Sequence, residues 1–552
     1  MSYLDVPRLH FYGTFTANPS TRNNDPANYN KLEPPFLPVP TLDPGWNPDG
    51  DHTWAFVGCT VQTVIGPNGS PSQDVLVGTA VSSTGTESGS NPKLVDLDTE
   101  QQLVSMIFGL QIQIGDSASG SVTGNFQPQP FLDLNGNSAY YQSVLQDLTW
   151  SSDLASPVLQ ELQKISPDAL SIKFDLVLTQ LSQGKPASGT ITGTIGPASP
   201  GEPANFLLGR LMRPQASPSA LAVKGHATPQ MVAQMATQSA PSANYTPFVV
   251  DSNRRKVIVD FGNSFSTYDL GTLQVAILPS QGSPQILGTV EYTQNTYQTL
   301  AAIQEFDATA DQISSLQSSI LGVLFEGSPI LAEDQNATSL AVTPMVCRLN
   351  PGKSAQIDLV ALSFGAPAAH HTIQIQIDNS QIENNNPIVQ PIGTPTNALQ
   401  FPASVTTDAN GRACFTLTAA PGGPGNPRGS IDGQIYGIGF TWQLDSNPDP
   451  WVFVSVHAYD HVSVPASPNW ENDVLPILGP YDDLYPFMAN LINLAKRDQV
   501  LKHAKQIAFR LQLPKTDPRH MPVTRDLSAN KRQIVLNWFH HQTQGPGGTT
   551  GG

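Results

Sequence analysis

Apolar and polar residues alternate in short stretches over most of the chain. In the opening segment, Leu9 and Phe11 are two positions apart, Phe15 follows four positions later, and mostly polar residues lie between them. This is the two-residue period of a half-buried β-strand. Further strand-like runs lie at 54–64, 74–81, 103–114, 120–131, 189–195, 256–261, 271–278, 371–377, 413–417 and 451–456. The pattern predicts a mainly β protein built from several antiparallel β-sandwich or barrel-like modules.

Helical spacing is confined to a few segments. Leucines three and four positions apart predict a helical insertion over 140–165, interrupted at Pro157, and a similar spacing predicts a helix over 308–324. Near the end of the chain, a continuous apolar stripe predicts a helix over 488–511, and Ser528 is placed to cap a last helix. The sequence therefore predicts a small α-helical C-terminal domain.

These changes of pattern divide the chain into modules. We expect an N-terminal β domain over 1–205 with a long loop over 18–51, a second β region over 206–346, an immunoglobulin-like sandwich over 347–468, a helical domain over 469–545 and a flexible tail over 546–552. Within the sandwich, Asn410-Gly411 predicts a type I′ hairpin turn, because these residues readily adopt the positive φ values that this turn requires.

The amino-acid composition limits the kinds of partner that the protein is expected to bind. Only 13% of residues are charged, the formal net charge is −17, and no basic run of five or more residues occurs. Binding to nucleic acid or to an anionic membrane surface is therefore not expected. The chain has no apolar run of about 18 residues that could span a membrane, and it opens directly on a strand pattern rather than a signal sequence. We expect a cytoplasmic protein.

The three cysteines limit the cofactors. Cys59, Cys347 and Cys414 lie far apart and form no Cys-x-x-Cys motif, which excludes covalently attached c-type haem and a cysteine-based zinc ribbon. We expect buried, reduced thiols and no covalently held cofactor.

Candidate chemistry is sparse. In the segment His457-Ala-Tyr-Asp-His461, a strand would project His457 and His461 from one face, which makes them candidate metal ligands, with Asp460 as an added acid–base candidate. Two residues four apart on a strand lie about 13 Å apart, so joint ligation needs a bulge. A polar strand end is the alternative. His10, on the face opposite Leu9, is either a catalytic residue or a hydrogen-bonded histidine at a domain interface.

Six short segments occur in the same order as in a known enzyme family. They are Leu4–Gly13, Asn18–Asp25, Gly209–Pro214, Asp269–Leu273, Tyr481–Met488 and Met521–Arg532. On these segments the chain resembles the N-terminal region of the family of iminophenyl-pyruvate dimer synthases and chromopyrrolate synthases. The resemblance covers most of the chain, although the motifs are short.

What the resemblance implies is limited to a class of chemistry. The family enzymes are about twice as long and couple two imine-containing aromatic α-keto-acid derivatives oxidatively. Their ferritin-like iron-binding domain lies beyond the matched region, and this chain shows no Glu-x-x-His pair on a four-helix pattern. No functional residue of the family carries over to a position here.

Three hypotheses follow from these observations. The first is a stand-alone relative of the family's N-terminal module, which acts on an aromatic, amino-acid-derived small molecule in secondary metabolism or supports a partner oxidase subunit. The second is a non-catalytic protein that binds carbohydrate or protein, or assembles into a homo-oligomer. The third is a metal-dependent enzyme centred on His457 and His461, with the metal unknown.

Overall fold

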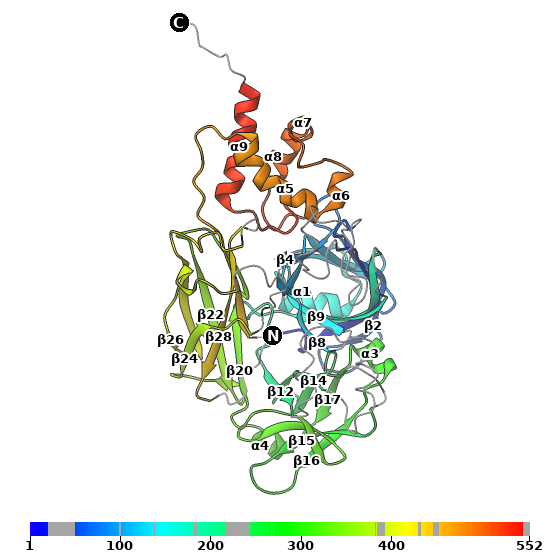
Figure 1. Cartoon of the computed structure of the whole chain (residues 1–552). Helices are drawn as coiled ribbons and strands as arrows, with labels where there is room; N and C mark the ends of the chain where they lie inside the picture. The colour runs from blue at the N-terminus through cyan, green and yellow to red at the C-terminus, as the bar shows by residue number, and fades with distance from the viewer. Residues whose placement is uncertain are drawn as a thin grey trace.

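The computed structural model describes most of the chain. The described residues are 1–19, 50–98, 101–135, 138–180, 185–215, 243–265, 268, 270–380, 382, 392–428, 432–444 and 452–544. Most of the expected loop over 18–51 and all of the expected tail over 546–552 lie outside them. The predicted fold class is confirmed: antiparallel sheets make up most of the molecule, and several helices gather at one end (Figure 1).

The first module is a curled nine-stranded sheet in the order β2-β1-β11-β10-β9-β7-β6-β3, with β8 paired to β9. Its strands are β1 Arg8–Ala17, β2 Trp54–Ile65, β3 Val81–Gly85, β6 Leu110–Asp116, β7 Gly120–Phe126, β8 Leu132–Asn135, β9 Ser138–Trp150, β10 Leu170–Gln180 and β11 Ala187–Pro197. A separate hairpin joins β4 Lys93–Asp98 to β5 Gln101–Phe108. Phe174 lies at the centre of the core and contacts the rings of Trp54, Phe56, Phe126 and Tyr141.

The helix expected over 140–165 is wrong in its first half. Residues 138–150 form β9, and only α1, Pro157–Ile165, is helical, with the Ser156 side chain accepting from the Leu159 N–H. A β-bulge explains the misleading spacing: the register of β9 on β7 shifts there, and Asp147 has φ 52°. Because the bulge adds one residue to β9, Leu145 and Leu148 can belong to one strand although they are three positions apart, a spacing that is typical of a helix.

The run expected as a strand over 74–81 is also wrong. Residues 74–80 form turns, and the carboxylate of Asp74 accepts hydrogen bonds from the backbone N–H groups of Leu76 and Val158, at 2.9 and 3.0 Å. These bonds hold the turn against the start of α1.

The second module is an eight-stranded sheet in the order β16-β15-β18-β19-β12-β13-β14-β17. Its elements are β12 Arg210–Pro214, β13 Thr246–Asp251, β14 Lys256–Asp260, β15 Leu273–Leu278, β16 Gln285–Val290, α3 Gln294–Leu300, β17 Ile303–Asp307, α4 Ala310–Ser315, β18 Ile320–Phe325 and β19 Ser328–Ala332. The helix expected over 308–324 exists only as α4, because the apolar run from Ile320 pairs with β15 instead.

The third module packs two five-stranded sheets face to face, with one core that draws residues from both. One sheet holds β20 Thr338–Thr343, β22 Ser354–Ser363, β23 Ala366–Pro367, β25 Leu399–Gln400 and β27 Arg412–Ala419; the other holds β21 Val346–Leu349, β24 Thr372–Ile377, β26 Ser404–Thr406, β28 Gln434–Trp442 and β29 Phe453–Ala458. A short 3-10 helix spans Thr396–Ala398. Because β20 belongs to this sandwich, the expected boundary at residue 346 falls inside it.

The predicted type I′ hairpin at Asn410-Gly411 is wrong. The turn connects β26 in one sheet to β27 in the other, so the two strands do not pair. Gly411 has φ 69°, but Asn410 is not among the residues with positive φ. The Asn-Gly pair therefore marks a crossing between sheets.

The C-terminal domain is helical, as predicted (Figure 1). It contains a π-helical turn Trp470–Val474, α5 Leu475–Leu484, α6 Pro486–Ala489, α7 Arg497–Lys502, α8 Ala504–Gln512 and α9 Ala529–Gln544. The continuous helix expected over 488–511 is broken, because the Leu494 N–H bonds the Asp482 carboxylate at 3.0 Å instead of a carbonyl of its own turn. Ser528 caps α9 as expected, accepting from the Lys531 N–H at 3.3 Å.

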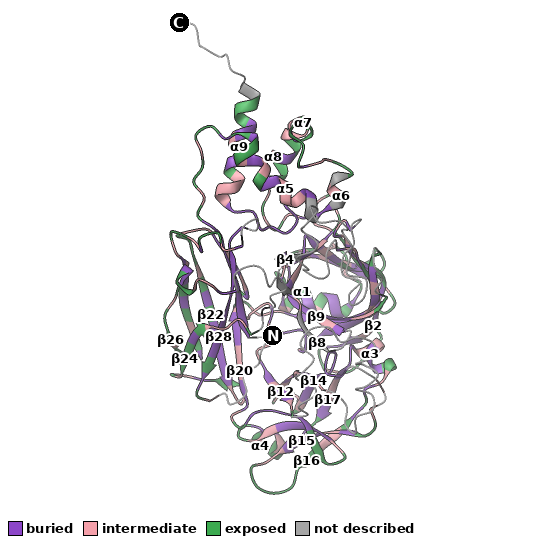
Figure 2. Ribbon diagram, in the orientation of Figure 1, coloured by how far each residue is buried: buried purple, intermediate pink, exposed green. Residues whose placement is uncertain are grey.

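The cores of the modules are built mainly from buried apolar side chains, and each sheet contributes buried residues to them (Figure 2). Among the helices that the structure describes, none has the length and apolar character needed to cross a membrane.

Replacement of Gly193 by alanine is expected to destabilise the first module by about 1–3 kcal/mol, the usual cost of overpacking. Gly193 lies between Phe11 and Phe174 on neighbouring strands, and an added Cβ would stand 2.4 Å from the Phe11 ring and 2.8 Å from the Lys173 carbonyl. The free energy of unfolding, from denaturant titration, tests this. Gly422→Ala is the control, because its Cβ would meet no atom within 4 Å; equal effects of the two changes would contradict the packing.

Candidate functional site

One face of the nine-stranded sheet is polar along four neighbouring strands. The registers of β1, β11, β10 and β9 place side chains in two lateral rows: His10, Thr194, Lys173 and Gln142 in the first, and Tyr12, Thr192, Asp175 and Tyr140 in the second. Their neighbours along each strand, such as Phe11 and Phe174, point to the opposite face and form the core. The second module covers the polar face.

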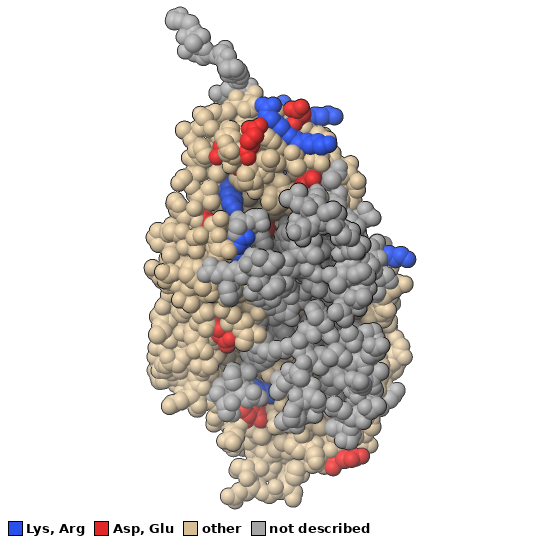
Figure 3. Space-filling model, in the orientation of Figure 1, with Lys and Arg blue, Asp and Glu red and all other residues tan. Residues whose placement is uncertain are grey.

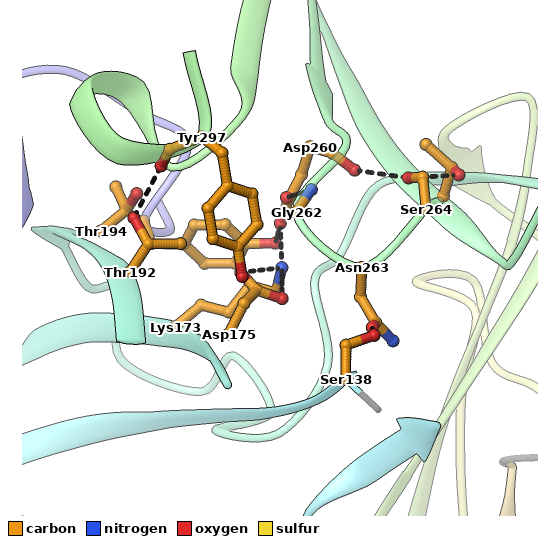
Figure 4. Close-up of polar contacts among 12 residues, drawn as sticks. Ser138, Lys173, Asp175, Thr192, Thr194, Asp260, Gly262, Asn263, Ser264 and Tyr297 are labelled. Atoms are coloured by element: carbon orange, nitrogen blue, oxygen red, sulfur yellow. Dashed lines mark hydrogen bonds and ion pairs between the residues drawn. The ribbon is translucent and has the colours of Figure 1, made fainter. Parts of the chain in front are cut away.

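Lys173 forms the centre of a buried ionic cluster at this junction. Its Nζ lies 2.9 Å from Asp175 Oδ1 and 2.8 Å from Asp260 Oδ2, at the end of β14. The Tyr3 hydroxyl donates to the same Asp260 oxygen at 2.7 Å. The three charged side chains are at most 5% exposed. One ammonium therefore faces two carboxylates in a site removed from water (Figure 4).

A tight turn after β14 brings the second module against Asp175. The Gly262 N–H bonds Asp260 Oδ1 at 2.9 Å, and a Cβ on Gly262 would lie 2.4 Å from Asp175 Oδ2. Only glycine allows this approach. Next in the turn, Asn263 accepts a hydrogen bond from the Ser138 hydroxyl at 2.6 Å, which ties the turn to β9.

The two carboxylates have unequal surroundings. Burial raises the pKa of Asp175 to about 7; the charge of Lys173 opposes this shift and the charge of Asp260 adds to it. Burial alone would lower the pKa of Lys173, but the two carboxylates outweigh it and raise that pKa. At neutral pH, Lys173 is charged, and the pKa of Asp175 lies near the ambient pH, which is the match that a general acid–base needs.

Tyrosines surround the ionic cluster. The ring of Tyr297 points toward Lys173 and Asp175 (Figure 4), and its hydroxyl is buried and has no hydrogen-bond partner among the described residues. Tyr268 packs edge-on to Tyr297 with ring centroids 5.6 Å apart, and Lys173 Nζ lies 4.8 Å from the ring centroid of Tyr140. Tyr12 reaches the second module by a hydrogen bond from Gln298. Three of these tyrosines, Tyr12, Tyr140 and Tyr268, are half-buried and reach solvent.

His10 is part of this interface and not a free base. Its Nδ1 lies 2.9 Å from the Thr194 hydroxyl, and Arg8 Nε donates to its Nε2 at 3.4 Å. Burial, and next the charge of Arg8, lower the pKa of His10 well below its ordinary value, so the ring is neutral. Arg8 continues to Glu305 on β17 at 2.8 Å. Of the two sequence interpretations, the contacts agree with the hydrogen-bonded interface histidine.

The His457-to-His461 segment does not form one strand face. β29 ends at Ala458; His457 is buried and contacts the carbonyl oxygen of Asp432, whereas His461 is exposed. Asp460 is buried, and its two oxygens accept from the backbone N–H groups of Asn426 and Gly433 at 2.6 and 2.7 Å. It connects loops. Within the described ranges, no group of three or more His, Cys, Asp or Glu side chains is arranged to hold a metal ion.

The cysteines are free thiols. Cys59 and Cys347 are buried, as predicted, and burial raises the pKa of each to about 12. Cys414 is exposed on β27, which contradicts the prediction for that residue.

Sequence reasoning missed Lys173, Asp175 and Asp260. A signal was present, because Lys173 and Asp175 are charged residues inside the otherwise apolar strand Leu170–Leu178. Charges at alternate positions of a strand share one face, and a buried strand requires partners for them. The partner Asp260 comes from another module, and the sequence pattern around it does not indicate that it pairs with Lys173.

No family model and no curated protein matches the chain. The resemblance described above therefore stays a prediction.

Replacement of Lys173 by methionine is expected to destabilise the protein by about 3–5 kcal/mol, because it leaves two buried carboxylates without a counter-charge. Adding Asp175→Asn to that variant should recover part of the loss. Thermal and denaturant unfolding measure both effects. Lys164→Met is the control, because that side chain is 74% exposed; a similar small effect at both lysines would refute the burial argument.

The raised pKa of Asp175 predicts a pH dependence. Between pH 3.8 and about 7, the folded protein holds a proton on Asp175 that the unfolded chain releases, so this group's contribution to stability falls as pH rises through that window. In Asp175→Asn this decline should disappear. Melting temperatures across the window, compared with wild type, decide the matter, and parallel curves for the two proteins would argue against a shifted Asp175.

Proposed function

We propose that the chain acts in the cytoplasm on an aromatic, amino-acid-derived small molecule at the Lys173–Asp175–Asp260 cluster, in the oxidative chemistry of secondary metabolism. The observation that carries the proposal is the pairing of a buried lysine with an aspartate whose pKa is about 7, inside a surround of tyrosines. A perturbed carboxyl next to a fixed cation is the combination that enzymes use to transfer protons near neutral pH.

The surrounding side chains suit an aromatic substrate. Tyr12, Tyr140 and Tyr268 present half-buried ring surface beside the charged groups, and aromatic rings pack well edge-on or offset against one another. The ammonium of Lys173 attracts a carboxylate, the group that amino acids and their α-keto acids share. The unpaired hydroxyl of Tyr297 is a further donor or acceptor aimed at the same place.

The chain's own residues would orient the molecule and move protons. Asp175 would take a proton from, or return it to, the imine nitrogen or the side-chain carbon next to the C=N group, while Lys173 remains charged and holds the carboxylate. The oxidising equivalents would come from a partner oxidase subunit. The resemblance to the dimer-synthase family supports this class of substrate, and the chain would act as a biosynthetic enzyme or as an accessory subunit.

The proposal predicts a product that depends on this chain. L-tryptophan or L-phenylalanine, treated with an amino-acid oxidase to generate the imine, should give a new species by mass spectrometry only when the protein is present. Asp175→Asn should lower its rate by roughly 100-fold or more, the usual contribution of a general acid–base.

Matched variants separate chemistry from folding. Asp168→Asn makes the same chemical change at an exposed position and should leave the rate unchanged, and melting curves must show that Asp175→Asn is folded. If the wild-type protein neither forms a product nor binds phenylpyruvate or indole-3-pyruvate by calorimetry, the proposal fails.

A second candidate is a non-catalytic binding or assembly protein. The near-complete burial of Lys173, Asp175 and Asp260 favours it, because the cluster would then serve to lock two modules together. Mass photometry and a glycan array discriminate the two: a defined homo-oligomer or glycan binding, without turnover, supports this second role.

A further inference from the structure

A second group of cations lies where three parts of the molecule meet. The hairpin β4–β5 contributes Val95, Leu97, Val104 and Phe108 to a small apolar cluster. The helical domain adds Tyr485, between α5 and α6, and Val523, between α8 and α9, and Val346 of the sandwich packs against the cluster. Arg348 on β21 bridges these parts, because its guanidinium donates to the carbonyl oxygens of Thr524, at 2.8 Å, and Leu97. In Figure 1, β4 lies next to the helical domain, whereas β14 lies farther from it.

Arg525 shapes the segment that carries the other cations. It is buried, has φ 54°, and packs its guanidinium 4.2 Å from the ring centroid of Phe108. Its nitrogens donate to the carbonyl oxygens of Lys515, Asp517 and Val523. All three contacts are made to neutral carbonyl oxygens, so Arg525 forms no direct ion pair among the described residues, although the charge of Asp517 acts on it from a greater distance.

Lys515 stands beside these arginines and is half-buried. Its Nζ donates to the Tyr459 hydroxyl at 3.1 Å and lies 5.3 Å from the centroid of the same ring. Burial first, and then the charges of Arg348, Arg532 and Arg525, lower the pKa of Lys515 to about 7, while Asp526 opposes the shift. Burial and the neighbouring positive charges therefore both favour the neutral form of Lys515.

The nearby acids are engaged elsewhere. Asp517 pairs with Arg519 at 2.7 Å, Asp432 with Lys531 at 3.5 Å, and Asp526 accepts from Tyr481 and Thr524. Among the described residues, no carboxylate lies within ion-pair distance of Arg348, Lys515 or Arg525. The charge of Asp526 acts on Lys515 and that of Asp517 acts on Arg525 without a direct ion pair, so the cluster is only partly neutralised. In a chain with a net charge of −17, such a cluster is an exception. Among the described residues visible in Figure 3, charged side chains gather mainly over the helical end.

We propose that Lys515, Arg348 and Arg532 form a binding site for a small oxyanion, a carboxylate or phosphate group. All three side chains are half-buried and retain contact with solvent, so an anion can reach them. The bound anion would add negative charge to this partly neutralised cluster, through charge-assisted hydrogen bonds to the ammonium and guanidinium groups. This site does not depend on the function proposed for the Lys173 cluster.

Calorimetric titration of the full chain with sodium phosphate and, separately, with sodium benzoate tests the site, with sodium chloride at equal ionic strength as the blank. Wild type should bind at least one probe, and Lys515→Gln should weaken that binding roughly tenfold or more, as expected for loss of one charge-assisted contact. Lys515→Arg should retain it. Binding of benzoate alone identifies a carboxylate site, and binding of phosphate alone a phosphate site.

Lys505→Gln is the matched control, because it removes the same charge from an exposed position on α8 of the same domain. If Lys515→Gln melts early without ligand, Arg532→Gln replaces it in the titration. The proposal is overturned if wild type binds neither probe beyond the chloride blank, or if both glutamine variants bind like wild type.

The pH profile gives an independent readout. Benzoate keeps one negative charge above pH 6, so a change in its affinity reports on the protein. Binding should weaken as pH rises through about 7, because Lys515 loses its proton there. The other charged groups that act on Lys515 are Arg348, Arg525, Arg532 and Asp526. Neutral His520, whose pKa burial lowers to about 4, and Tyr459, whose pKa burial raises, do not titrate in that range. A flat profile counts against the assignment.

Discussion

The structure depends on one lysine held between two carboxylates where two β modules meet. Moving an ammonium and two carboxylates out of water costs several kcal/mol for each ion, and the mutual attraction returns this only when geometry is good and the remaining hydrogen bonds are made. Here Tyr3, the Gly262 N–H and the close approach of the turn make those bonds. Such a junction selects one arrangement of the modules, because any sliding would separate charges that water no longer reaches.

Much of the fold could be read from local patterns, and the errors have a common cause. The period of two in the opening segment and the cap at Ser528 each describe a short stretch whose structure its own residues decide. The bulge at Asp147, the strand from Ile320 and the crossing at Gly411 are instead decided by partners far away in the chain. Leucine spacing in β9 looks helical only because an extra residue interrupts the alternation, and no local rule reports that interruption.

The candidate functional residues show the same difference between what local sequence decides and what distant partners decide. His457, Asp460 and His461 drew attention because they are close in sequence, yet the fold gives each a separate environment. Lys173 and Asp260 belong to different modules, and only the pairing of β10 and the turn after β14 brings them together. The charged pair inside an apolar strand was the one usable sign. The cations around Lys515 also come from distant segments, Arg348 from β21 and Arg532 from α9, and only the fold brings their charges together.

The polar face of the first sheet has a consequence for synthesis on the ribosome. Lys173 and Asp175 emerge before Asp260 and Tyr297, so the nine-stranded sheet can close while the module that covers it is still unmade. During that interval, the surface awaiting its cover is made of hydroxyls, an imidazole and an ion pair, all of which water solvates well. A nascent chain with this polar surface does not expose the apolar patch that causes partly synthesised multidomain proteins to aggregate.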